Sequence, residues 1–224
     1  MKTILVSGSS SGIGFAICEE SKKQGHNVIG ISRNINSRAT ELGIRSYSVD
    51  VTNQNQINEL VNNLTSENIT IDILINNAGL LIKDKFRDTT DDTFKKVYDV
   101  NIFGLANLTR ALLPIINKDG QVINITSVGG LNKSKKFPGL SAYASSKGAL
   151  ITLTEVLAEE YRSRPRFNCL ALGSVKTKML AEAFPGYEAK ITPDEMAKQI
   201  LDFAFDQNNT RNGEIITLDK GNLE

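Results

Sequence analysis

The chain has 224 residues, a formal net charge of +1, 40% hydrophobic residues and 23% charged residues. This composition is typical of a globular domain, and the balanced charge argues against bulk electrostatic binding to nucleic acid or to an anionic membrane. Because no apolar run could span a membrane and the apolar start is too short for a signal peptide, we expect a cytoplasmic protein with no membrane partner.

Cysteine and histidine are scarce. The two cysteines, Cys18 and Cys169, fall in an expected helix and an expected strand and are predicted to fill the core. The single histidine, His26, excludes a metal site built on imidazoles. We therefore predict no metal centre.

Short β-branched segments alternate with longer helical patterns along the whole chain. The expected strands are Thr3–Val6, Asn27–Ile31, Ile44–Val49, Ile71–Asn76, Gln121–Thr126, Arg166–Ala171 and Glu214–Leu218. The expected helices are Gly12–Gln24, Gln54–Glu67, Asp91–Ile116, Ala142–Ser163 and Pro193–Asp206. This alternation predicts an α/β single-domain Rossmann fold over residues 1–224, with a doubly wound, mostly parallel seven-stranded sheet flanked by helices.

A glycine-rich turn joins the first expected strand to the first helix. It reads Gly8-Ser9-Ser10-Ser11-Gly12-Ile13-Gly14. Glycines permit a tight turn and close approach of backbone amides to a pyrophosphate, and the N-terminus of the helix adds free N–H groups and a positive dipole. Its place between strand and helix favours a phosphate-binding turn over a simple turn.

Tyr143 and Lys147 lie four residues apart in a segment expected to be helical. Their side chains would then share one face of the helix. A nearby ammonium favours the phenolate and is expected to lower the pKa of the tyrosine, which ordinarily is about 10. The pair could act as an acid–base group if a carbonyl or an alcohol were held beside it.

Three motifs occur in order on the expected elements. They are Gly8-x-x-x-Gly12-x-Gly14, Asn76-Asn77-Ala78-Gly79 and Tyr143-x-x-x-Lys147. Together they resemble the short-chain dehydrogenase/reductase family over essentially the whole chain. The resemblance implies an NAD(P)-binding catalytic domain and an oxidoreductase that interconverts a carbonyl and an alcohol.

The resemblance also implies four catalytic residues, namely Asn101, Ser127, Tyr143 and Lys147. Tyr143 would donate a proton to the carbonyl oxygen in reduction, and Ser127 would orient the same oxygen. Lys147 would hold the ribose hydroxyls of the cofactor and lower the pKa of Tyr143. Asn101 would hold a water that links the lysine to solvent, while the nicotinamide would supply the hydride.

The end of the second strand bears on the choice of cofactor. A carboxylate at this point would bind the ribose 2′-hydroxyl of NAD, but the sequence has Ser32-Arg33-Asn34. A guanidinium can pair with a 2′-phosphate, so NADP(H) is favoured over NAD(H). The alternative is that Arg33 is only a solvated charge in a loop.

The remaining cofactor contacts are implied by the resemblance. Asp50 and Val51 would lie against the adenine, and Asn77, Ala78 and Gly79 would line the adenosine ribose. The full expected set is Gly8, Ser10, Ser11, Gly12, Ile13, Gly14, Arg33, Asn34, Asp50, Val51, Asn77, Ala78, Gly79, Tyr143, Lys147, Gly173, Val175 and Thr177. Leu172 replaces the proline that the family usually has before Gly173, so that turn loses a fixed φ angle.

Two segments around the expected site depart from the family. The loop before Tyr143 is lengthened and carries Lys133, Lys135 and Lys136. These lysines could contact an acidic substrate or acyl carrier, or form a solvated basic loop. The lid region, residues 178–192, is short, and its Met179, Leu180, Phe184 and Tyr187 either line an open pocket or only pack the lid.

The expected function is an NADP(H)-dependent oxidoreductase acting on a small-molecule carbonyl/alcohol pair. A 3-oxoacyl-thioester and a small ketone or aldehyde are both candidate substrates. The alternative is a non-catalytic NADPH-binding sensor or scaffold. The family resemblance also implies a homodimer or homotetramer, through the helices that carry Asn101 and Tyr143.

Overall fold

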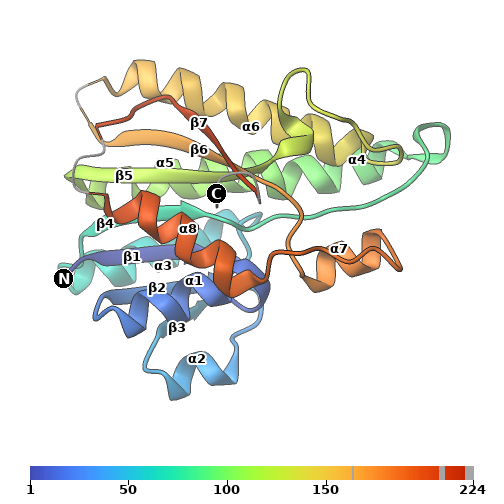
Figure 1. The fold of residues 1–224 in the computed structure, drawn as a ribbon. Helices are drawn as coiled ribbons and strands as arrows, with labels where there is room; N and C mark the ends of the chain where they lie inside the picture. The colour runs from blue at the N-terminus through green and yellow to red at the C-terminus, as the bar shows by residue number, and fades with distance from the viewer. Residues whose placement is uncertain (163, 207–209, 220–224) are drawn as a thin grey trace.

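Seven parallel strands form one twisted sheet in the order β3-β2-β1-β4-β5-β6-β7 (Figure 1). The computed structural model describes residues 1–162, 164–206 and 210–219. The strands are β1 Thr3–Ser7, β2 Asn27–Ser32, β3 Arg45–Ser48, β4 Ile71–Asn76, β5 Ile116–Ser127, β6 Arg166–Leu172 and β7 Ile215–Leu218. The predicted doubly wound parallel sheet is confirmed.

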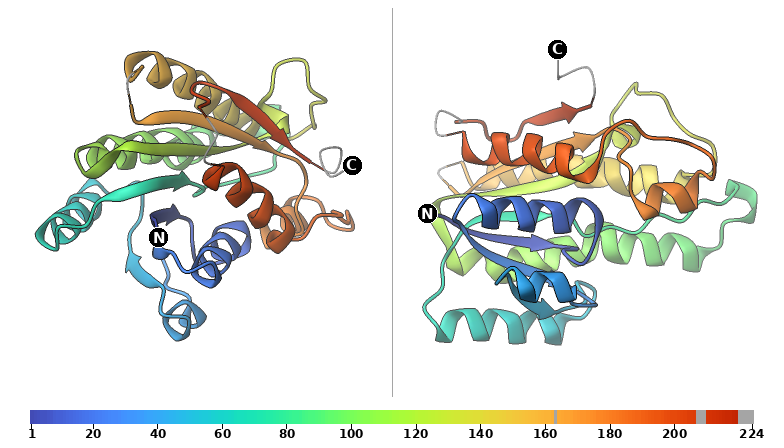
Figure 2. Two further views of the ribbon diagram at one scale, coloured as in Figure 1. Left: turned by 60° about the vertical axis from the view of Figure 1, so that its left-hand side comes forward. Right: turned by 60° about the horizontal axis from the view of Figure 1, so that its bottom comes forward.

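Helices lie on both faces of this sheet (Figure 2). The α-helices are α1 Gly12–Lys23, α2 Ser37–Glu41, α3 Gln54–Ser66, α4 Asp91–Tyr98, α5 Leu105–Leu112, α6 Ser141–Glu160, α7 Lys178–Ala183 and α8 Pro193–Phe205. Short 3-10 segments occupy η1 Phe86–Asp88, η3 Leu113–Ile115 and η4 Val128–Gly130, and η2 Asp99–Gly104 is a π-helical turn.

The core forms two layers because side chains alternate along each buried strand. Ile4 and Val6 of β1 pack in one layer with α1 and α8. Leu5, between them, points into the other layer with α3 and α5. Burial on both faces explains why these strands are nearly continuous apolar runs.

The helix predicted over Asp91–Ile116 is interrupted. It divides into α4, the π-helical turn η2, α5 and the 3-10 segment η3, which contains Pro114. Gly104 ends the π turn where a Cβ would lie 2.8 Å from Val51 Cγ2, so the backbones approach closely there.

Two short helices were not predicted. Asn36 caps α2, and Thr177 caps α7. Both are too short for an apolar periodicity to show in the sequence. Ser163, the predicted end of the helix that begins at Ala142, lies outside the described residues.

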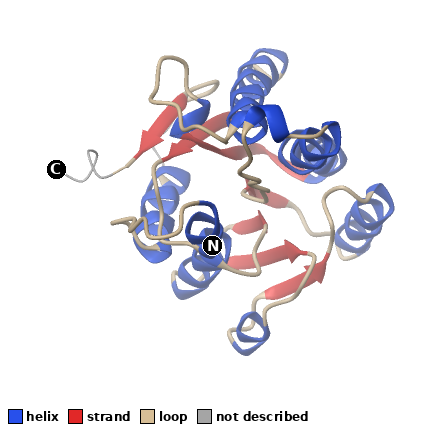
Figure 3. Ribbon diagram, turned by 90° about the vertical axis from the view of Figure 1, so that its right-hand side faces the viewer, coloured by secondary structure: helices blue, strands red, loops and turns tan. Residues whose placement is uncertain are grey.

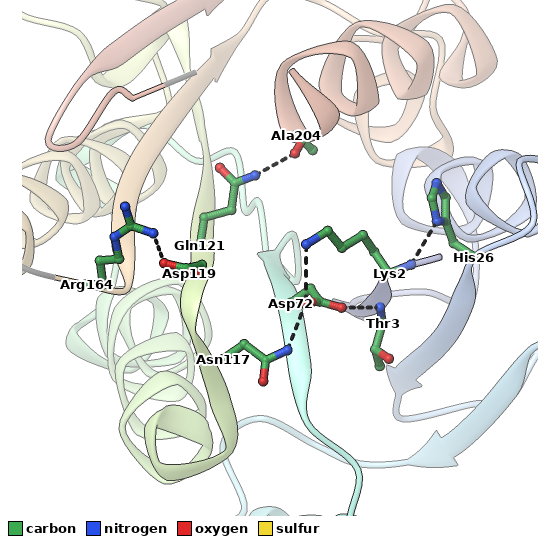
Figure 4. A network of polar contacts seen from close by, with 9 residues as sticks. All are labelled: Lys2, Thr3, His26, Asp72, Asn117, Asp119, Gln121, Arg164 and Ala204. Atoms are coloured by element: carbon green, nitrogen blue, oxygen red, sulfur yellow. Dashed lines mark hydrogen bonds and ion pairs between the residues drawn. The ribbon is translucent and has the colours of Figure 1, made fainter. Parts of the chain in front are cut away.

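Polar contacts tie the amino ends of the central strands together, opposite the carboxyl ends (Figure 4). The Asp72 carboxylate accepts hydrogen bonds from the Thr3 N–H at 2.7 Å and from Asn117 Nδ2 at 2.8 Å, and Lys2 Nζ lies 3.5 Å away. Next to them, His26 Nδ1 accepts from the Lys2 N–H at 3.2 Å. The His26 ring stacks on Phe205 with centroids 4.3 Å apart.

We expect His26 to make the fold less stable in mild acid. Burial and the N-terminal ammonium lower its pKa below the ordinary 6.5, against a smaller raising effect of Asp72. Folding therefore favours the neutral ring, whose contribution is complete above the unfolded pKa and is lost as the pH falls through the folded pKa. Urea unfolding at about pH 7.5 and about pH 5.5 should show a smaller loss of stability for His26→Asn than for wild type. An identical loss in both proteins would contradict this assignment.

Candidate active site

A cleft of about 1280 Å³ runs along the carboxyl ends of the strands, the edge that faces the viewer in Figure 3. Its lining includes every predicted cofactor-binding residue and three of the four predicted catalytic residues, Ser127, Tyr143 and Lys147. Parallel strands place all their carboxyl ends at one edge, so residues that are distant in sequence meet there. Asn101 is the exception: it is fully buried and does not line the cleft.

The glycine-rich turn is a close-fitting cradle. Gly8 and Gly12 have φ angles of +70° and +57°, which favour glycine. A Cβ at Gly14 would lie 2.3 Å from the Gly8 carbonyl oxygen. The Ser11 side chain does not cap α1, so the first N–H groups of the helix point to the cleft without that partner. This backbone fits a pyrophosphate group.

The segment Asn76–Gly79 braces the turn. Asn77 Nδ2 donates to the Ser7 carbonyl at 3.0 Å and to the Gly8 carbonyl at 3.3 Å. The Ser7 hydroxyl accepts from the backbone N–H groups of Asn77 and Ala78, each at 3.0 Å. Asn77 and its neighbours therefore shape the cradle as well as lining the cleft.

Arg33 and Asn34 are exposed and line the cleft just after the carboxyl end of β2. The Ser32 hydroxyl donates to the Asn34 carbonyl at 2.7 Å and shapes the loop. Asn36, which sequence reasoning missed, donates from Nδ2 to the Ser10 carbonyl at 3.0 Å and so links this loop to the glycine turn. Its place as an N-cap before a short helix is the signal that could have found it.

Asn101 uses its carboxamide to join two segments. Its Oδ1 accepts from the Leu80 N–H at 2.7 Å, and its Nδ2 donates to the Leu80 carbonyl at 3.0 Å and to Ser146 Oγ at 2.9 Å. The buried Ser146 hydroxyl in turn donates to the Tyr143 carbonyl at 2.7 Å. The side chain of Asn101 therefore holds the loop after β4 against α6.

Ser127 and Tyr143 meet at the floor of the cleft. β5 ends at Ser127, whose hydroxyl accepts from the Gly129 N–H at 3.2 Å and lies beside the Tyr143 phenol. Burial raises the pKa of Tyr143 to about 12, and the neighbouring Ser127 hydroxyl only partly opposes this. The phenol is therefore protonated at neutral pH.

Lys147 is almost completely buried, with 3% of its surface exposed. Its Nζ donates to the Ile125 carbonyl at 2.8 Å and lies 5.8 Å from the centroid of the Tyr143 ring. Burial lowers the pKa of Lys147 to about 8. For Tyr143, burial rather than the Lys147 ammonium is the largest cause of the shift in pKa.

The segment after β6 keeps its expected course despite Leu172. The Gly173 N–H donates to the Leu218 carbonyl at 2.9 Å. Thr177 caps α7 and reaches the glycine turn, since a Cβ at Gly12 would lie 3.5 Å from its Cγ2. Val175 forms a bridge with Ile191, which ties down both ends of the lid segment.

The three lysines of the loop before α6 occupy different environments. Lys136 Nζ donates to the carbonyls of Gly129 and Leu131 at 2.7 and 2.6 Å and to Ser134 Oγ at 3.1 Å. Lys136 is thus a structural clamp of its own loop. Lys135 lines the cleft, whereas Lys133 is exposed and does not.

Comparison with known proteins identifies the chain. The family model described as short chain dehydrogenase matches residues 2–188. The chain belongs to the short chain dehydrogenase family. It is an oxidoreductase with the nucleotide-binding fold of that family.

Relatives of the family match nearly the whole chain. The 3-oxoacyl-acyl-carrier-protein reductase FabG of Thermotoga maritima is 31% identical over 242 residues, covering 98% of this chain and 97% of its own. A short chain dehydrogenase of Shigella flexneri complexed with NADP has a TM-score of 0.88 at 26% identity, covering 96% of each chain. 4-hydroxyisoleucine dehydrogenase complexed with NADH has a TM-score of 0.86 at 28% identity, covering 98% of this chain and 97% of that one.

Membrane-spanning helices and metal-binding clusters are both absent from the described residues. Within residues 1–162, 164–206 and 210–219, no helix has the length and apolar character that crossing a membrane requires. The same described residues contain no group of three or more His, Cys, Asp or Glu side chains arranged to hold a metal ion.

Proposed function

We propose that this short chain dehydrogenase is an NADP(H)-dependent enzyme that interconverts a carbonyl and an alcohol, with Tyr143 as the acid–base group. The observation that carries the proposal is that Ser127, Tyr143 and Lys147 line the same cleft as the glycine-rich turn, with the Tyr143 phenol beside the Ser127 hydroxyl. We propose further that residues 1–224 act as one catalytic domain in a homodimer or homotetramer.

Each residue has a role that follows from its contacts. Tyr143, protonated at neutral pH, gives its proton to the carbonyl oxygen in reduction and takes one back in oxidation. Ser127 hydrogen-bonds the same oxygen, where negative charge develops. The bound dinucleotide supplies the hydride to the carbonyl carbon.

Lys147 and Asn101 assist this proton transfer without touching the carbonyl oxygen. The Lys147 ammonium lines the cleft and donates a hydrogen bond to the Ile125 carbonyl. The ribose hydroxyls of a bound cofactor would accept hydrogen bonds from the same ammonium, in place of this carbonyl or together with it. Its pKa of about 8 leaves it mostly charged at neutral pH. Asn101 is a positioning residue, because its carboxamide is fully engaged with Leu80 and Ser146.

Substrate reduction is tested directly. Purified protein is mixed with NADPH and a panel of 3-oxoacyl thioesters, ketones and aldehydes, and the absorbance of the reduced nicotinamide is followed. Turnover of at least one carbonyl supports the enzyme. Tight NADPH binding without turnover of any panel member would favour the alternative, a sensor or scaffold.

The preference for NADP(H) rests on Arg33. Arg33→Ala should weaken NADPH binding about tenfold to hundredfold and leave NADH binding nearly unchanged, because a guanidinium–phosphate hydrogen bond stabilises by about 1.5–3 kcal/mol. Dissociation constants for both dinucleotides are measured by calorimetry.

A matched control for Arg33 lies five positions further along the chain. Arg38 is also exposed, but its guanidinium is held by Glu19 Oε1 at 2.7 Å and does not line the cleft. Arg38→Ala should keep the NADPH preference. Equal affinity of the wild-type protein for NADPH and NADH would show that Arg33 is a bystander.

A further inference from the structure

An aromatic pair from two different segments lines the cleft. Phe137 comes from the loop before α6, and Phe184 follows the lid helix α7. Their rings meet edge to face, with centroids 6.2 Å apart, and both line the cleft. Val128, Leu140 and Leu180 also line it, so the wall around the position of a bound carbonyl is largely apolar.

A lysine ammonium lies over each of the two aromatic rings. The Lys83 ammonium lies 4.1 Å from the centroid of the Phe184 ring, and Lys135 Nζ lies 5.8 Å from that of Phe137. Both lysines are exposed, and among the described residues neither makes an ion pair with a carboxylate. Of these two ammonium groups without a carboxylate partner, Lys135 lines the cleft, and Lys83 lies outside the lining, over the ring of Phe184.

The segments that bear these groups are held in place. Lys136 clamps the loop of Phe137, and the Asp84 N–H donates to the Gly139 carbonyl at 2.9 Å, which joins the loop of Lys83 to the same loop. The Ser174 and Tyr187 hydroxyls lie 3.0 Å apart and tie down the lid. These contacts fix the positions of the segments that carry Lys83 and Lys135.

The charge around the lid favours an anion. Among the cleft-lining residues of 178–191, Lys178 and Lys190 are cationic and Glu188 is the one carboxylate. Lys178 is partly offset, since Glu182 Oε1 lies 3.7 Å from its Nζ. With Lys135 added, the lid and the loop before α6 contribute three lysines to the cleft lining against the carboxylates of Glu188 and Asp219, and Lys83 lies just outside the lining on the Phe184 ring.

We propose that the substrate is a carbonyl compound that is apolar next to the reacting carbonyl and carries an anionic group at its far end. Phe137 and Phe184 contact the apolar part, and Lys83 and Lys135 bind the anion. This inference rests on the proposed reductase function. The anion is the carboxylate of a small oxo acid or the phosphate of an acyl thioester carrier, since both present oxygen acceptors to an ammonium.

Binding and turnover of matched pairs test the proposal. One pair is a medium-chain secondary-alcohol carboxylate and its methyl ester, titrated by calorimetry into protein loaded with NADP⁺. The other is an oxoacyl coenzyme A and the corresponding N-acetylcysteamine thioester, compared by kcat/KM. Preference for the carboxylate, or for the coenzyme A thioester, identifies the source of the anion.

The expected ratio of anionic to neutral ligand is about tenfold at low ionic strength, and salt reduces it. The double variant Lys83→Met/Lys135→Met should bring the ratio close to one. Lys133→Met removes one lysine charge from the loop of Lys135, at a position that neither lines the cleft nor lies over Phe137 or Phe184, and should leave the ratio unchanged. Because each ratio is taken within one variant, general effects on folding or on hydride transfer cancel.

Three results separate this inference from the proposed function. A ratio near one in the wild type overturns the inference. If the neutral thioester is still turned over, the proposed reductase function stands. A wild-type preference that the double variant keeps also overturns the assignment to these lysines. If nothing is turned over, the reductase fails, and the calorimetric ratio still decides whether this part of the cleft selects anions.

Discussion

Replacing Tyr143 by phenylalanine should lower kcat by about a hundredfold to ten thousandfold, the range expected when a positioned acid is removed. The phenol lies beside Ser127 in the cleft and is protonated at neutral pH, so it can donate a proton. The ring itself would remain, so the cleft should keep its shape. The measurement is the steady-state rate with the best carbonyl of the panel, beside the dissociation constant of NADPH.

A matched Tyr→Phe change controls for loss of a hydroxyl elsewhere. Tyr161 packs against Phe167, with ring centroids 5.4 Å apart, and does not line the cleft. Tyr161→Phe should keep kcat within about twofold of wild type. Full activity of Tyr143→Phe, with folding and NADPH binding intact, would contradict the assignment of the proton donor.

Gly14→Ala should abolish tight dinucleotide binding, weakening it by about a hundredfold or more. A Cβ at this position would lie 2.3 Å from the Gly8 carbonyl oxygen and 2.5 Å from Asn77 Nδ2, so the turn must move away from α1. Forced displacement in a packed region costs about 1–3 kcal/mol of stability. Calorimetric titration with NADPH measures the first effect, and urea unfolding measures the second.

Gly25 separates the steric effect from the conformational one. Gly25 has a φ angle of +80° but no atom within 4 Å of the position that a Cβ would occupy, whereas Gly14 has an ordinary helical backbone and a blocked Cβ position. Gly25→Ala should therefore cost some stability and leave NADPH affinity unchanged. If Gly14→Ala binds NADPH as wild type does, the turn is not the pyrophosphate cradle.

Much of the fold could be predicted because its signals are local. Apolar periodicity separates strands from helices, and the buried Ile57, Leu60 and Leu64 of α3 follow the helical spacing. The predicted helix after β4 failed at the π turn, because that turn depends on Gly104 meeting Val51 from a distant segment. No periodicity in the sequence reports such a contact.

The sequence proposed candidate site residues one by one, most of which line one cleft, but it could not give their burial or their pKa values. The sequence places Tyr143 and Lys147 one helical turn apart, which suggested that the lysine lowers the pKa of the phenol. In the structure, burial raises the pKa of Tyr143, and the Lys147 ammonium donates to the carbonyl of Ile125, 22 residues away along the chain. Desolvation depends on all surrounding elements, so it follows only from the folded chain.

The lysine-rich loop before α6 is a second case in which the sequence gives the residues and the structure gives their environments. By sequence its lysines are equivalent charges, but the structure makes Lys136 a clamp, leaves Lys133 in solvent and sets Lys135 beside Phe137. Lys83 joins Lys135 although it belongs to another segment, and Phe184 brings the lid to both. The identity of the substrate-facing groups is therefore a tertiary property.

By itself, the sequence determined the order of strands and helices and the chemical groups at the strand ends. It could do so because hydrophobic periodicity is local and a parallel sheet gathers its carboxyl ends at one edge. Only the tertiary structure decided which of those groups are desolvated, which are occupied by hydrogen bonds and which face the cleft. Those properties depend on neighbours that are far away along the chain and close in space.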